Sequence, residues 1–250
     1  MNFRVIGCEG SRLEDSRPVS MLLGSRVMLD AGSAGCVPPE IQDGLDTVLL
    51  THAHLDHVLE LGFLLDNTSG FRSGPLTVMG SRACISIVRE HYMNGRLWPD
   101  FSRITTAAGP MLRYVEMPDL EWFRLPGGIE AMAVPVNHSA GARGFIFRSG
   151  GAAMVYSGDT GPTEEIWRRA GEMPELTMAW VECSFPDRLR DLAMVSDHLC
   201  PSLAREQMAL LGRPDVARFA FHLKRRLRDE TVAELGADFR IPANGDGFVL

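Results

Sequence analysis

Lysine is nearly absent from the sequence. Lys224 is the only lysine among 250 residues, and every other cationic side chain is an arginine. The formal net charge is −7 at pH 7, whereas a broad nucleic-acid-binding face requires clustered lysine and arginine. The charge balance therefore disfavours a nucleic-acid partner. A small anionic substrate would have to be held by local cations, which bound metal ions can supply.

The sequence also lacks paired cysteine motifs and long apolar runs. Its five cysteines include no C-x-x-C and are odd in number, which favours free thiols in a reducing compartment. No apolar run approaches the ~18 residues of a membrane span, and residues 1–10 show no basic segment followed by an apolar one. We therefore expect a cytoplasmic protein with no membrane partner.

No repeat, linker or low-complexity segment divides the chain. Hydrophobic residues make up 45% of it and charged residues 23%, so we expect one globular domain over residues 1–250. Apolar runs bounded by turn residues predict strands at 3–7, 19–23, 27–30, 46–50, 76–79, 122–125, 129–136, 144–148, 152–156, 176–181 and 216–221. Capping and periodicity predict helices at 40–44, 58–65, 81–93, 162–170, 201–211 and 225–235.

Three of the seven histidines lie within six positions. The run Thr51-His52-Ala53-His54-Leu55-Asp56-His57 follows a predicted buried strand and precedes a predicted helix. His52 and His54 are two apart, so they point the same way in an extended segment, while Asp56 and His57 turn into the helix and can face a second ion. Imidazoles and a carboxylate crowded at such a turn indicate a divalent-metal site of zinc type. A polar loop is the alternative, which four ligand-type residues in this order disfavour.

Further ligand-type side chains follow other predicted strands, where loops of an α/β protein carry chemistry. They are His138, Asp159 and His222. A buried binuclear site needs about four protein ligands per ion with one ligand shared, and these three would complete such a set. Taken singly, His138 or His222 could equally be a core histidine. His91 has no ligand-type neighbours in sequence, and we expect it in a surface or structural role.

The H-x-H-x-D-H run at 52–57 resembles the metallo-β-lactamase superfamily of binuclear metal hydrolases. With Leu55, its H-x-H-L-D-H form is similar to the class II 3′,5′-cyclic-nucleotide phosphodiesterases, as are Glu182-Cys183-Ser184-Phe185-Pro186 and the turn at 197–199. The resemblance implies an α/β fold of the metallo-β-lactamase type, an αββα sandwich with two mixed sheets face to face and helices outside. It also implies hydrolysis of cAMP or cGMP to the 5′-monophosphate by a metal-bridging hydroxide.

The same resemblance implies a set of metal ligands. The first ion would be bound by His52, His54 and His138, the second by Asp56, His57 and His222, and Asp159 would bridge them. Two divalent ions are implied, with Zn²⁺ the default for nitrogen and oxygen ligands and Mn²⁺ or Fe²⁺ as alternatives.

The leaving alkoxide of a phosphodiester also needs a proton. By resemblance, we predict His198 as the general acid, Glu182 as the carboxylate that orients it and raises its pKa, and Asp56 as a group near the hydroxide. Position 197 is aspartate where the family often has glycine. Lys224 matches a His-Ile-Lys pattern of the family and is a predicted phosphate contact, with a solvated helix start as the alternative.

Three other functions compete with this prediction. A ribonuclease Z-like tRNA 3′-processing endonuclease uses the same ligands, but that family usually has glycine at the position of Leu55 and a long arm between the ligands matching His138 and Asp159, where this chain has room for one hairpin. A phosphodiesterase for another cyclic phosphodiester and a non-catalytic metal-binding module are the others.

Residues 94–118 are irregular, and their aromatics predict either a wall that stacks on a nucleobase or plain packing. Base preference and a homodimeric state stay open.

Overall fold

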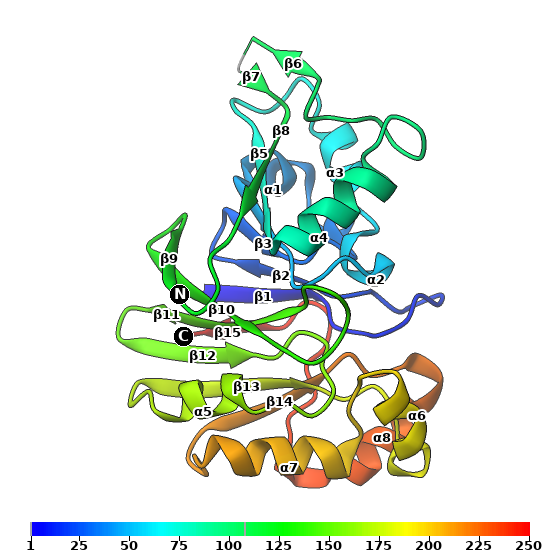
Figure 1. Cartoon of the computed structure of the whole chain (residues 1–250), viewed down its shortest axis with the longest axis vertical. Coiled ribbons are helices and arrows are strands. Elements are labelled where there is room, and N and C mark those ends of the chain that lie inside the picture. The colour runs from blue at the N-terminus through cyan, green and yellow to red at the C-terminus, as the bar shows by residue number, and fades with distance from the viewer. Residues whose placement is uncertain (1, 108) are drawn as a thin grey trace.

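Two mixed β-sheets lie face to face in the computed structural model, which describes residues 2–107 and 109–250 (Figure 1). The larger sheet has the order β15-β1-β2-β3-β4-β5-β8. Its strands are β1 (Asn2–Gly7), β2 (Ser20–Leu23), β3 (Val27–Leu29), β4 (Thr47–Leu49), β5 (Leu76–Gly80), β8 (Leu112–Glu116) and β15 (Gly247–Val249). The smaller sheet has the order β14-β13-β12-β11-β10-β9. Its strands are β9 (Trp122–Leu125), β10 (Ile129–Pro135), β11 (Arg143–Ser149), β12 (Ala152–Tyr156), β13 (Leu176–Glu182) and β14 (Ala217–Phe221).

The two sheets share a core of buried side chains. Successive side chains of a strand point to opposite faces, so Val27 and Leu29 of β3 enter the cluster between the sheets while Met28 joins the cluster on the outer face. From the smaller sheet, Phe145 and Trp180 meet them in the same central cluster. Strands covered on both faces need apolar residues at every position, which explains their continuous apolar runs.

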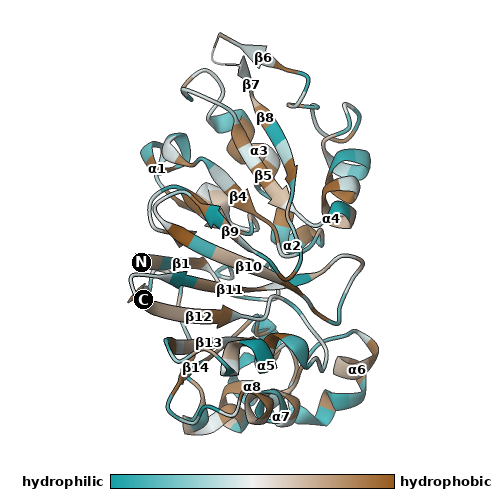
Figure 2. Ribbon diagram, turned by 60° about the vertical axis from the view of Figure 1, so that its left-hand side comes forward, coloured by the Kyte–Doolittle hydropathy of each residue, from teal (hydrophilic) through white to brown (hydrophobic). Residues whose placement is uncertain are grey.

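Helices cover the outer faces of both sheets. The α-helices are α1 (Pro39–Gly44), α2 (Leu55–Val58), α3 (Leu61–Asn67), α4 (Arg82–Ile87), α5 (Glu165–Gly171), α6 (Arg190–Val195), α7 (Pro201–Leu211) and α8 (Arg228–Leu235). Helices α3 and α4 contribute to the outer core of the larger sheet, and α5, α7 and α8 to that of the smaller. Outer helices such as α4 and α7 carry both apolar and hydrophilic residues (Figure 2), as amphipathic helices do. This arrangement confirms the predicted αββα sandwich.

Several local predictions are also confirmed. The Ser81 side chain accepts a hydrogen bond from the Cys84 amide at 3.2 Å and caps α4, and a π-helical segment, Val88–Tyr92, continues that helix. Helix α7 has the predicted bounds. His91 is exposed, as expected. Within residues 2–107 and 109–250, no helix combines the length and the apolar content of a membrane span.

Two edge strands were not predicted. Strand β8 lies inside the segment 94–118 and pairs in parallel with β5, while β15 lies near the C-terminus and pairs antiparallel with β1. Both pairings join distant parts of the sequence, so the local pattern gave little signal. Phe101 is buried in the outer core, so its ring is not part of an exposed base-stacking wall. The remaining strands of this region, β6 (Thr105–Thr106) and β7 (Gly109–Pro110), form a small separate hairpin.

The helices depart from prediction in smaller ways. Helix α5 begins at Glu165 rather than at Pro162, and α6 occupies a segment for which no helix was predicted. Short 3₁₀ turns not separately predicted are η1 (Ala34–Cys36), η3 (Asp187–Leu189), η4 (Arg225–Leu227) and η5 (Gly236–Asp238).

Candidate metal centre

The predicted ligands meet at one end of the sandwich because several strands end there. Strands β12, β13 and β14 are parallel neighbours, and β10 runs in the same direction because it is antiparallel to β11, which is antiparallel to β12. Their carboxyl ends therefore share one edge, and loops at such an edge carry chemistry in α/β proteins. The residues that follow β10, β12 and β14 include His138, Asp159 and His222. The turn after β4 brings His52 to His57 to the same place from the other sheet.

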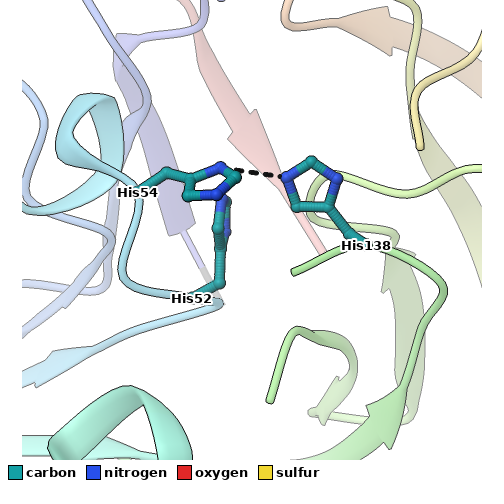
Figure 3. A group of neighbouring side chains, drawn as sticks. All are labelled: His52, His54 and His138. Carbon is teal, nitrogen blue, oxygen red and sulfur yellow. Dashed lines mark hydrogen bonds between the residues drawn. The ribbon is translucent and has the colours of Figure 1, made fainter. Parts of the chain in front are cut away.

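His52, His54 and His138 form the first group. One ring nitrogen of each lies within 4.8 Å of the others. Figure 3 shows the three rings converging from two chain segments, with His54 Nδ1 and His138 Nε2 3.1 Å apart. Two imidazoles of one turn thus meet a third from the opposite sheet, in the arrangement that a shared cation would need.

Asp56, His57, Asp159 and His222 form the second group. Asp159 Oδ2 lies 3.3 Å from His57 Nε2, 3.1 Å from His222 Nε2 and 3.9 Å from His52 Nε2. Asp159 therefore stands between the two groups, and its pKa is informative. Burial raises that pKa, but His222 and His57 lower it by more and hold it well below the usual aspartate value. The carboxylate is ionised at the centre of the cluster.

Hydrogen bonds fix which nitrogen faces the centre in four of the five predicted ligand histidines. Asp30 accepts from His57 Nδ1 at 2.8 Å, and the Asp197 carbonyl accepts from His138 Nδ1 at 2.9 Å. When Nδ1 carries the proton, Nε2 keeps the lone pair that a metal requires. For both histidines Nε2 points at the other ligand-type groups.

Two hydroxyl groups assign the rings of His52 and His222 in the same way. The Thr51 hydroxyl is 2.9 Å from Asp30 Oδ2 and 3.0 Å from His52 Nδ1. A hydroxyl has one proton to donate, and the carboxylate takes it, so Thr51 accepts from His52 Nδ1. The Ser184 hydroxyl lies 3.1 Å from Glu182 Oε2 and 2.9 Å from His222 Nδ1. It therefore donates to the Glu182 carboxylate and accepts from His222 Nδ1.

The cluster leaves buried polar atoms without partners. His52 Nε2, His57 Nε2 and Asp159 Oδ1 are buried and make no hydrogen bond of good geometry within the described chain. Buried polar atoms are normally satisfied, and these three all lie in the two ligand-type groups. Imidazole nitrogens and an ionised carboxylate are the donor set of zinc-type sites, in which a bound cation takes the place of a ring proton. The residues present therefore fit divalent cations.

The backbone around the centre is strained. Asp30, Asp197 and His222 have φ values of 54°, 51° and 63°, which places three of the four left-handed non-glycine residues of the described chain in this site. Such conformations cost free energy and persist only where the surroundings enforce them. Position 197 is also where the resembled family often has glycine, the residue that adopts this backbone most readily. Asp197, in place of that glycine, thus keeps the left-handed turn and the backbone carbonyl that contacts His138.

Beside the cluster lies the predicted pair of Glu182 and His198. His198 Nδ1 is 2.6 Å from Glu182 Oε1, which also accepts from the Thr160 amide at 3.3 Å. Burial lowers the pKa of His198, but Glu182 raises it by more, so the pKa lies above the usual histidine value. His198 shares a group of ligand-type atoms within 4.8 Å with His138 and Asp159. A charged imidazole with one nitrogen engaged can donate a proton from the other.

Lys224 lies close to this pair. Its Nζ donates to the Gly10 carbonyl at 3.1 Å and sits 5.3 Å from the centre of the Phe185 ring. The Phe185 ring is in turn 5.9 Å from the His198 ring. The half-buried lysine is therefore held near the site rather than fully solvated at a helix start.

The structure thus brings all the predicted site residues to one place, while their roles as ligands and catalysts stay predictions. Asp30, Thr51 and Ser184 had no predicted role. The sequence signal for Asp30 was a carboxylate directly after a buried strand, at the same edge as His52. Ser184 stood inside a motif that was recognised for Glu182 alone.

Comparison with known proteins places the chain. Residues 26–222 match the family described as the beta-lactamase superfamily domain. A probable 3′,5′-cyclic-nucleotide phosphodiesterase of Yersinia pestis is 24% identical over 188 residues, 68% of this chain and 52% of the relative. Ribonuclease TTHA0252 of Thermus thermophilus is 31% identical over 180 residues, 66% of this chain and 39% of the relative.

Solved structures share the fold. Unliganded yeast PDE1 superposes with a TM-score of 0.81 at 17% identity, covering 96% of each chain. The chain spans about half the length, or less, of the curated relatives named above. Because the family match extends over most of the sequence and the sandwich is that of the family, the chain belongs to the metallo-β-lactamase superfamily.

Proposed function

We propose that this protein is a metal-dependent phosphodiesterase that hydrolyses 3′,5′-cyclic nucleotides to 5′-monophosphates. The observation that carries the proposal is the pair of Glu182 and His198 beside the ligand cluster. A ribose 3′ alkoxide is a poor leaving group and needs a proton as its bond to phosphorus breaks. A proton donor adjoining a cation site meets that demand.

The seven predicted ligands would hold two divalent ions. When bound, such ions lower the pKa of water and offset the negative charge of phosphoryl oxygens. The protein's part is to position the reactants. The Asp56 carboxylate lies 3.3 Å from His222 Nε2 and has a lowered pKa, because the nearby histidines outweigh its partial burial. It is ionised and can accept a hydrogen bond from the attacking water.

The leaving oxygen is served by His198. The attacking oxygen, as hydroxide, forms its bond to phosphorus and keeps its proton, while the bond from phosphorus to the 3′ oxygen breaks and the 3′ oxygen takes the proton from Nε2 of His198. Glu182 holds Nδ1 and favours the charged ring. We assign Lys224 to a phosphate oxygen, because its ammonium group lies near this pair.

The ribonuclease alternative rests on relatives such as Ribonuclease TTHA0252. The β11–β12 hairpin, with its turn at Gly150 and Gly151, fills the segment between His138 and Asp159. This segment therefore leaves no room for a tRNA-clasping arm. A diesterase for another cyclic phosphodiester is a nearer alternative, because the site chemistry would be the same.

Substrate assays on purified protein test the proposal. Bound metal is measured, and turnover is followed with bis(p-nitrophenyl) phosphate, cAMP, cGMP and a tRNA precursor. Metal content with turnover of a cyclic nucleotide and none of the precursor is expected. Cleavage of the precursor alone would favour the ribonuclease, and absence of both metal and turnover would favour a non-catalytic module.

A further inference from the structure

A pocket of about 490 Å³ lies beside Lys224, within two residues of the metal-centre histidine His222. Its volume is within the range of small-molecule sites, roughly 300–1,000 Å³. The lining residues come from two short segments and are Ser11, Leu13, Lys224, Arg225, Arg226 and Leu227. Among these lining residues, Lys224 is the one to which a role has been assigned above.

Both walls of the pocket are tied to the metal centre. Gly10 precedes one wall, and a side chain at that position would meet the His222 ring at 2.6 Å. Lys224 bonds to the Gly10 carbonyl, and the Arg225 amide donates to the Ser11 hydroxyl at 3.0 Å. These contacts hold the two segments side by side and place one edge of the pocket next to His222.

The lining has a particular chemistry. Leu13, with 45% of its surface exposed, and the half-buried Leu227 supply apolar walls. Arg225 and Arg226 are exposed, and neither forms a side-chain ion pair in the described chain. The lining contains no acidic or amide side chain, and arginine and lysine can only donate hydrogen bonds. A ligand that fits needs an apolar body and an edge of acceptors.

We propose that this pocket receives the nucleobase of the substrate and selects guanine over adenine. The proposal rests on the cyclic-nucleotide function and deepens it. Guanine offers the acceptors O6 and N7 side by side to a guanidinium, whereas adenine places an amino group beside N7 that needs an acceptor. The apolar walls cover the faces of either base, so the arginines alone set the preference.

Calorimetric titration of the zinc-loaded protein with 5′-GMP and 5′-AMP tests this directly. We expect 5′-GMP to bind about tenfold more tightly, as one bidentate contact allows. In the variant Arg225→Gln/Arg226→Gln the ratio should fall to near one, because glutamine also offers an acceptor to adenine. The control Arg113→Gln alters an exposed arginine on β8, outside this lining, and should keep the wild-type ratio.

The outcomes separate this proposal from the proposed function. Equal affinities in the wild type, or a ratio that the double substitution leaves unchanged, would overturn guanine selection. Because binding is measured with a mononucleotide, it needs no turnover. If the protein hydrolysed no diester but still bound 5′-GMP more tightly than 5′-AMP, the proposed function would be refuted while guanine selection by the pocket would be supported.

Discussion

The two halves of the ligand cluster are built in different ways. Residues 52–57 place four ligand-type side chains on one turn, so their spacing is set by local backbone alone. His138, Asp159 and His222 come from three separate strand ends, and only the assembled smaller sheet brings them together. The first half is therefore a local sequence motif, whereas the second half forms only when the tertiary fold is complete. Substitutions that act on one half or on the link between them can test this contrast.

The largest effect should follow from Asp159→Asn, because Asp159 lies within 3.9 Å of histidines from both halves. Removing its charge removes the shared anion of the cluster. We expect turnover of bis(p-nitrophenyl) phosphate to fall by about 10³-fold, equivalent to several kcal/mol of lost charge stabilisation. The amount of bound metal should fall as well. Metal analysis and steady-state kinetics measure both. Full metal content with full activity would show that Asp159 does not join the halves.

His198→Ala should give the next largest effect, and a selective one. We expect cAMP or cGMP hydrolysis to fall by about 10²-fold, the lower end of what a general acid contributes. Hydrolysis of bis(p-nitrophenyl) phosphate should fall far less, because nitrophenolate leaves without a proton. Kinetics with both substrates measure the difference. Equal losses on the two esters would contradict the role of His198 as proton donor.

The supporting residues of the two halves should then behave differently. Asp30→Asn disturbs only His57 and Thr51, whereas Ser184→Ala disturbs both His222 and Glu182. Each should weaken zinc binding by about 10–100-fold, as outer-sphere substitutions do. Ser184→Ala alone should also lower the ratio of cyclic-nucleotide to nitrophenyl-ester turnover. Chelator competition and the two assays measure these effects.

A matched control sharpens that pair. Ser86 lies on α4, and within the described residues its hydroxyl bonds only to Glu90, so Ser86→Ala should keep zinc affinity and both activities. If Asp30→Asn changed the substrate ratio as strongly as Ser184→Ala, the two halves would not be functionally separate.

The same contrast explains how much was predictable. The turn at 52–57 and the bounds of α7 follow from apolar pattern and spacing, which are local properties, whereas the sandwich itself was implied by the family resemblance. The edge strands β8 and β15 depend on distant partners. The junction of His138, Asp159 and His222 does so too: the sequence placed each of them after a predicted strand, and the family resemblance assigned them to two ions. Asp30 and Ser184 had no predicted role because each acts by accepting a hydrogen bond from a histidine Nδ1, a contact that only the coordinates reveal.

The smallest effect is expected at Asp197, whose carbonyl supports His138 while its own backbone is left-handed. Asp197→Gly keeps the carbonyl and removes the side-chain strain, but it adds backbone entropy to the unfolded chain. These terms are each about 1 kcal/mol and opposed, so the melting temperature and turnover should change little. Asp197→Val should destabilise the fold by about 1–2 kcal/mol, because a β-branched side chain tolerates this backbone poorly. Thermal unfolding of both variants measures the difference. Equal losses in the two variants would mean that the aspartate side chain, rather than the backbone turn, supports the second half of the cluster.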